Sequence, residues 1–109
     1  MIVSVHLTKN SMVSKQVLAS QIAIHVRERG NVYKDWYIGI AADPESALFT
    51  DHTVKEDGDE WIFNACATAS DAREVAECFI KDDMKGDIAS NDPSAVWVYA
   101  YKISSTTKQ

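Results

Sequence analysis

The amino-acid sequence predicts an α+β fold, a small mixed or antiparallel sheet of roughly three to four strands flanked by about three helices. Compact apolar runs at 36–41 and 61–66 and an alternating run at 96–103 indicate strands. Apolar residues recur at helical spacing over 12–29 and 70–84. These patterns follow one another without a linker or an internal repeat. We therefore expect a single domain over residues 1–109, with 104–109 as a frayed polar tail.

The composition is that of an ordinary globular domain, with 46% hydrophobic and 25% charged residues and a net charge of −5. The longest mostly apolar run, 36–42, is far shorter than the roughly 20 residues that a membrane-spanning helix needs. The N-terminal residues lack the basic and apolar regions of a secretory signal. We therefore expect a cytoplasmic protein without a membrane partner, with Cys66 and Cys78 as reduced core thiols.

The first third of the chain predicts a strand and a helix. Residues 2–7 alternate between apolar and polar side chains, which is typical of a short strand. Asn10 or Ser11 can cap the helix over 12–29, and Gly30 can end it after a basic last turn. A competing interpretation makes 22–26 a strand of a hairpin, because Ile and Val favour strands.

The middle of the chain predicts a central strand followed by a short helix. Residues 36–41 are rich in aromatic and β-branched residues, and Gly39 marks a bulge or the close approach of another chain segment. Asp43 can cap a helix over 44–51, in which Pro44 suits the first position.

The last part of the chain predicts a strand, a helix and a final strand. After a polar loop over 54–60, the strand at 61–66 leads to Thr68 and Asp71, which have the spacing of a capping box. A clean apolar stripe predicts a helix over 70–84, which Gly86 ends. We expect a loop over 87–94 before the strand at 96–103.

Acidic residues concentrate between positions 43 and 60, where Lys55 is the single basic residue. A charge run of this kind is either a solvated face or an acidic surface that binds a basic partner or imitates nucleic acid. A net negative domain is repelled by a phosphate backbone unless it has a local basic patch. The acidic residues of this segment are Asp43, Glu45, Asp51, Glu56, Asp57, Asp59 and Glu60.

One motif resembles a known family. The tripeptide Tyr37-Ile38-Gly39 ends a strand, and the helix that follows leads to His52. Together these features resemble the GIY-YIG nuclease superfamily, which implies a small antiparallel sheet flanked by helices and the hydrolysis of a phosphodiester in DNA. In that family a tyrosine helps to deprotonate the attacking water, and one divalent metal, Mg²⁺ or Mn²⁺, stabilises the charge that develops on phosphate.

The resemblance assigns roles to particular residues. It implies that Tyr37, His52 and Glu77 are catalytic and that Glu77, on the 70–84 helix, holds the metal. Asn91 is a looser match to an asparagine that the family often has. The helix arginine of the family is replaced by Ala47, and its first glycine-isoleucine-tyrosine half has no counterpart here.

Each of these residues also has a structural explanation. Tyr37 suits core packing in a strand, Glu77 can pair with Arg73 or Lys81 on its helix, and His52 suits a helix end. Phosphate-binding glycine loops, a nucleophile elbow and zinc-type spacings are absent from the sequence.

Three functions therefore remain open. We expect a divergent, catalytically degenerate relative that binds a protein or nucleic acid without cutting it. The first alternative is an active metal-dependent DNA endonuclease in which Arg73 or Arg27 replaces the missing arginine. The second is an acidic module that uses the 43–60 face against a basic protein partner or as a nucleic-acid mimic.

Overall fold

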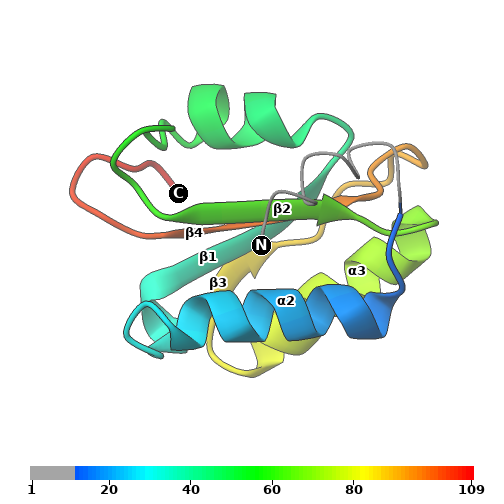
Figure 1. Ribbon diagram of the computed structural model, residues 1–109. Helices are drawn as coiled ribbons and strands as arrows, with labels where there is room; N and C mark the ends of the chain where they lie inside the picture. Colours follow the sequence, from blue (N-terminus) through cyan, green and yellow to red (C-terminus); the bar gives the residue numbers. More distant parts are fainter. Residues whose placement is uncertain (1–11) are drawn as a thin grey trace.

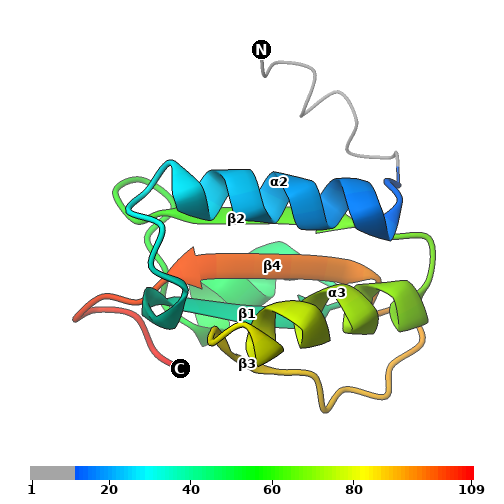
Figure 2. The ribbon, with the colours of Figure 1, turned by 90° about the horizontal axis from the view of Figure 1, so that it is seen from below.

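The computed structural model describes residues 12–109, so the predicted strand at 2–7 and the predicted caps Asn10 and Ser11 lie outside the described residues. The predicted fold class is confirmed: a four-stranded mixed sheet, in the order β2-β4-β1-β3, carries helices on both faces (Figure 1). The strands are β1 (Trp36–Ala41), β2 (Trp61–Ala65), β3 (Lys85–Asp87) and β4 (Trp97–Lys102). Helices α2 (Lys15–Arg27) and α3 (Ala69–Lys81) cover one face, and the short segment η2 (Ser46–Asp51) covers the other (Figure 2).

Helix α2 confirms the predicted helix but begins later, at Lys15. The Ser14 hydroxyl accepts a hydrogen bond from the Val17 amide at 3.1 Å, which satisfies one of the free N–H groups of the first turn. The chain leaves the helix through Gly30, which has a φ of 105° that favours glycine. The competing interpretation of 22–26 as a strand is wrong, because Ile22 and Val26 are buried on one side of α2.

Strand β1 has the predicted bounds and lies inside the sheet. It pairs antiparallel with β4 and parallel with β3. Successive side chains of a strand point to opposite faces. Trp36 and Ile38 therefore face α2 and α3, whereas Tyr37 faces η2.

Strand β3 lies where the sequence predicted the end of a helix and a loop. Its three residues are polar and exposed, so no apolar alternation marks them as a strand. Gly86 pairs with Ile38, and a Cβ atom added at Gly86 would clash with the Ile38 carbonyl oxygen. The pairing that completes the sheet therefore depends on a residue without a side chain.

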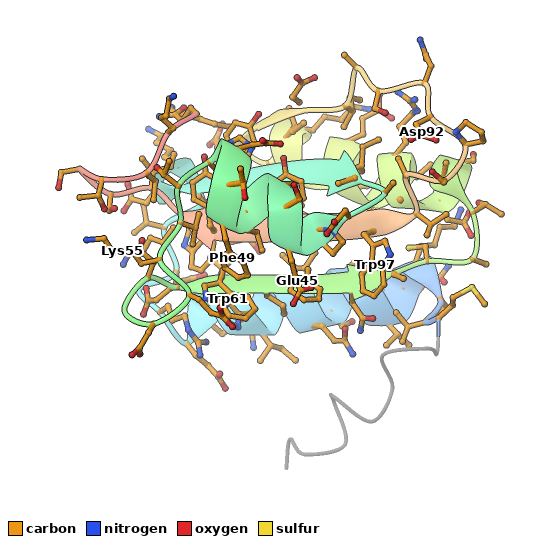
Figure 3. The ribbon with its side chains drawn as sticks, turned by 90° about the horizontal axis from the view of Figure 1, so that it is seen from above. Glu45, Phe49, Lys55, Trp61, Asp92 and Trp97 are labelled. Atoms are coloured by element: carbon orange, nitrogen blue, oxygen red, sulfur yellow. The ribbon has the colours of Figure 1, made fainter. Side chains whose placement is uncertain are left out.

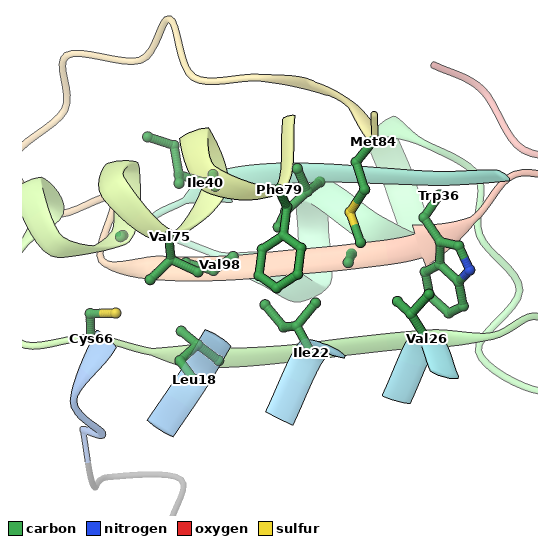
Figure 4. Packing of buried hydrophobic residues seen from close by; sticks show 14 residues of the cluster. Leu18, Ile22, Val26, Trp36, Ile40, Cys66, Val75, Phe79, Met84 and Val98 are labelled. Carbon is green, nitrogen blue, oxygen red and sulfur yellow. The ribbon is translucent and has the colours of Figure 1, made fainter. Parts of the chain in front are cut away.

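The main core lies between the sheet and the two long helices (Figure 4). Leu18 and Ile22 from α2 meet Phe79 from α3 over β1 and β4. The predicted cap of α3 is confirmed, since the Thr68 hydroxyl accepts from the Asp71 amide at 3.0 Å. The expectation of two core thiols is wrong in part: Cys66 is buried, but Cys78 is exposed.

The other face of the sheet carries a smaller core beneath η2. The Asp43 carboxylate accepts from the Ser46 amide at 3.1 Å, as the sequence predicted for this helix start. The segment Ser46–Asp51 is a π-helix, and the His52 amide donates to the Ala47 carbonyl five residues back at 3.0 Å. The buried residues of this smaller core are Tyr37, Ala47, Leu48, Val54, Tyr99 and Tyr101.

The C-terminal residues 104–109, which the sequence predicts to fray, make hydrogen bonds to the end of η2. The Lys108 amide donates to the His52 carbonyl at 2.7 Å, and the Thr53 hydroxyl donates to the Thr106 carbonyl at 2.8 Å. Within residues 12–109, no helix is long and apolar enough to cross a membrane.

Candidate functional site

The structure brings two of the predicted site residues together on the η2 face of the sheet. The rings of Tyr37 and His52 have centroids 4.7 Å apart, and Tyr37 also stacks on Tyr101 at 5.3 Å. Tyr37 comes from β1, Tyr101 lies opposite it on β4, and His52 follows the last turn of η2. The exposed fraction of His52 is 9%, so its ring is a core group.

Hydrogen bonds within the chain hold the ring of His52. Nδ1 lies 2.5 Å from the Lys108 carbonyl oxygen, which can only accept, so Nδ1 carries the hydrogen. Nε2 lies 2.9 Å from the Tyr99 hydroxyl, which can either donate or accept a hydrogen bond. The Tyr101 hydroxyl donates to the same Lys108 carbonyl at 3.1 Å. Both ring nitrogens of His52 therefore have partners within the chain.

The tyrosines of this cluster are held in their protonated form. Burial raises the pKa of Tyr99 and of Tyr101 well above the ordinary value of 10, because the phenolate form is poorly solvated there. Burial, and then the negative charge of Asp87, raises the pKa of Tyr37. Asp87 pairs with Gly39 on the neighbouring strand, which places it on the same face of the sheet as Tyr37. At neutral pH none of these three tyrosines supplies a phenolate base.

Gly39 of the tripeptide has a packing role. It lies directly opposite Tyr99 in the antiparallel pairing of β1 and β4. A Cβ atom added at Gly39 would lie 2.6 Å from Cζ of Tyr99, so the tyrosine ring occupies the space that a side chain would fill. The glycine thereby lets Tyr99 cross the strand toward His52.

Glu77, the predicted metal ligand, is not part of this cluster. It is exposed on α3, and α3 covers the face of the sheet opposite Tyr37 and His52. In the part of the chain that the structure describes, no group of three or more His, Cys, Asp and Glu side chains is placed to hold a metal ion.

The arginines proposed as replacements are also elsewhere. Arg73 donates from its guanidinium to the carbonyls of Ile88 and Ser90, so it holds the loop that follows β3. Arg27 is exposed at the end of α2, on the helical side of the sheet. Asn91 is exposed in the loop that Arg73 holds. Ala47, by contrast, packs in the same small core as Tyr37.

Sequence reasoning missed Tyr99, Tyr101 and the Lys108 carbonyl as members of the cluster. A signal for the two tyrosines was present, because the alternation over 96–103 places Tyr99 and Tyr101 on one face. This alternation does not predict that β4 pairs with β1 and β2. Every residue has a backbone carbonyl, so the sequence does not indicate that the carbonyl of Lys108 is part of the cluster.

A second feature of the same face is a row of half-buried aromatic rings, hereafter the aromatic row. Phe49 of η2 meets Trp61 of β2 edge to face, with centroids 5.1 Å apart. Trp61 stacks along β2 on Phe63 at 5.7 Å, and Phe63 meets Trp97 of β4 edge to face at 5.6 Å. Since β2 is an edge strand, the row lies at the border of the sheet (Figure 3).

Acidic residues lie beside the aromatic row. Glu45 precedes Phe49 by one helical turn, and in Figure 3 it lies along the same side of the molecule as Trp61 and Trp97. The loop between η2 and β2 adds exposed carboxylates, and the Trp61 indole donates to the Glu56 carbonyl of that loop at 3.1 Å. Aromatic rings and negative charge therefore occur together on this border.

Comparison with models of protein families, with curated proteins and with solved structures finds no match. The resemblance to GIY-YIG nucleases therefore rests on the tripeptide at Tyr37, the position of His52 and the order of the elements.

Proposed function

We propose that this chain is a catalytically inactive GIY-YIG-like domain that acts as a binding or accessory module. The observation that carries the proposal is the closed hydrogen-bond network of His52. Nδ1 binds the Lys108 carbonyl and Nε2 binds the Tyr99 hydroxyl, so both nitrogens are engaged within the chain and neither faces water. A histidine in this state is a structural group.

The placement of three positions supports the relation to this fold. Tyr37, Ala47 and His52 correspond to the tyrosine, arginine and histidine of the resemblance, and they meet in one small core on one face of the sheet. Tyr37 lies on β1, and Ala47 and His52 lie on η2 and at its end. They meet because η2 packs back over β1. The alanine makes the cluster apolar where a nuclease needs a cation beside phosphate.

The remaining parts of a nuclease centre are separated from this cluster. Glu77 lies on the opposite side of the sheet, and the raised pKa of Tyr37 disfavours its phenolate form. Metal-assisted hydrolysis requires the base, the metal ligand and the phosphate-binding cation at one place. The described residues distribute these groups over both faces.

The charge of the domain favours a protein partner over DNA. The net charge is −5, and seven carboxylates lie between positions 43 and 60. Such a surface repels phosphate and attracts a basic chain. A basic protein is therefore the partner class that the domain fits best.

Cleavage of supercoiled plasmid in Mg²⁺ or Mn²⁺ tests the proposal. The wild-type protein, Tyr37→Phe, Ala47→Arg and Glu77→Gln are compared, with circular dichroism confirming that each variant is folded. We expect no metal-dependent nicking by the wild-type protein. Nicking that Tyr37→Phe abolishes would establish an active endonuclease and overturn the proposal. Nicking by Ala47→Arg alone would identify a decayed site on the expected fold.

A further inference from the structure

We propose that the aromatic row is a docking surface for an arginine-containing basic segment of another protein. This inference rests on the proposed binding function and names the class of partner. It joins two separate observations on the same border of the sheet. These are the half-buried rings of Phe49, Trp61, Phe63 and Trp97, and the exposed carboxylates beside them.

The rings of the aromatic row follow one another along the border of the sheet. Trp61 and Phe63 lie nearly parallel, with an interplanar angle of 12°, and Trp97 closes the row from β4 with an angle of 73° to Phe63. Each of these rings keeps part of its surface accessible to solvent. A row of rings along an edge strand offers faces and edges to a chain that lies beside it.

The second observation is the charge around the row. Across residues 12–109, the carboxylates that form ion pairs are those of Glu28, Glu60, Asp71 and Glu74. None of the exposed side chains of Glu45, Asp51, Glu56 and Asp57 is in such a pair. Lys55 is the single cation in this stretch of the chain. Of these, Glu45 lies beside the row in Figure 3 and Glu56 belongs to the loop that binds the Trp61 indole, so negative charge that a cationic partner can neutralise borders the row.

The two observations together select the chemistry of the partner. A guanidinium group stacks on aromatic faces and pairs with carboxylates at the same time, because it is planar and always charged. Single-stranded nucleic acid also stacks on aromatic rings, but it needs a basic groove for its phosphates. The acidic border of this row excludes that partner and leaves a basic peptide.

Fluorescence anisotropy with labelled nona-arginine and nona-lysine tests the inference, since the two probes carry the same charge. A surface that acts through charge alone binds both equally, whereas stacking favours arginine. We expect the wild-type protein to bind nona-arginine about two- to fivefold more tightly than nona-lysine. A labelled oligothymidine of similar length is expected not to bind.

Single substitutions test the contribution of the rings and that of the carboxylates separately. Trp97→Leu keeps an apolar side chain but removes one ring of the row, and it is expected to reduce the preference for arginine. Glu45→Gln is expected to weaken both peptides by about twofold, because one exposed ion pair is lost. Glu77→Gln is the matched control, since it removes the same charge from the opposite side of the molecule and is expected to change neither affinity.

Two results would overturn the inference. One is equal affinity for the two peptides in the wild-type protein, and the other is an equal effect of Glu45→Gln and Glu77→Gln. If Trp97→Leu does not fold, Phe49→Leu at the other end of the row replaces it. Plasmid nicking tests the proposed function and does not depend on the preference for arginine. Failure of the proposed function and failure of this inference therefore give different results.

Discussion

The ring of Tyr99 crosses β1 at Gly39, and its hydroxyl reaches Nε2 of His52 at 2.9 Å. Gly39 thus leaves the space in β1 that the Tyr99 ring of β4 needs to contact His52 at the end of η2. The nuclease resemblance points to a reaction at this place, but the structure shows packing and closed hydrogen bonds.

Substitution of Gly39 by alanine is expected to destabilise the protein, because the new Cβ atom would overlap the Tyr99 ring. The free energy of unfolding is expected to fall by about 1–3 kcal/mol, the usual range for overpacking. Urea unfolding of Gly39→Ala, Tyr99→Leu and the double variant checks this. In the Tyr99→Leu background the effect of Gly39→Ala is expected to shrink, since the clashing ring is gone. Strict additivity of the two changes would contradict the packing role.

The tail is expected to stabilise the domain through the Lys108 backbone and not through its side chain. Deletion of residues 106–109 removes the carbonyl that binds His52 Nδ1 and Tyr101, and it leaves buried donors unpaired. We expect a loss of about 1–3 kcal/mol in unfolding free energy. Lys108→Ala keeps the carbonyl and is expected to change stability by less than about 0.5 kcal/mol. Equal thermal unfolding of the deletion and the wild-type protein would show that the tail contributes nothing.

The overall fold was predictable because its main elements carry strong local signals. The apolar run of β1 and the stripe of α3 gave their positions to within a few residues. Strand β3 was not predictable, since its pairing depends on the contact of Gly86 with the distant Ile38 backbone. The π-helical form of η2 was likewise not visible in the sequence.

The candidate site was predictable only in part, for a similar reason. Sequence spacing placed Tyr37 and His52 on consecutive elements, and these residues do meet. Whether α3 packs on the same face as His52 is decided by the path of the whole chain, so the expectation that Glu77 joins them had no local signal behind it. The Lys108 carbonyl belongs to the polar tail over 104–109, whose sequence does not indicate that it binds His52 and Tyr101.

His25 is expected to make the stability of the protein depend on pH. Its ring lies edge-on to Trp36 with centroids 5.6 Å apart, and its Nε2 is buried without a partner among the described residues. Burial, and then the positive charge of Arg29, lowers the pKa of His25 from 6.5 to about 4. Well above pH 6.5 the ring is neutral in both the folded and the unfolded chain, so it adds no pH dependence to the stability there.

As the pH falls from 6.5 to about 4, His25 is protonated in the unfolded chain but stays neutral in the folded protein. The free energy of unfolding therefore decreases over this range. Because part of the ring remains accessible to solvent, screening reduces this loss of stability to about 1–2 kcal/mol. Urea unfolding of the wild-type protein and His25→Gln across this pH range measures the difference. The variant is expected to lose less stability on acidification, and identical pH profiles would contradict the assignment.

The most direct measurement is an amide NMR titration of the isotope-labelled wild-type protein, with nona-arginine in one sample and with DNA and Mg²⁺ in a separate sample. We expect the peptide to shift signals along the aromatic row, at Phe49, Trp61, Phe63 and Trp97, and DNA with Mg²⁺ to shift none. Shifts on addition of DNA with Mg²⁺ that centre on Tyr37 and His52 would contradict the proposed function, because they would show that the tyrosine–histidine cluster binds a nuclease substrate.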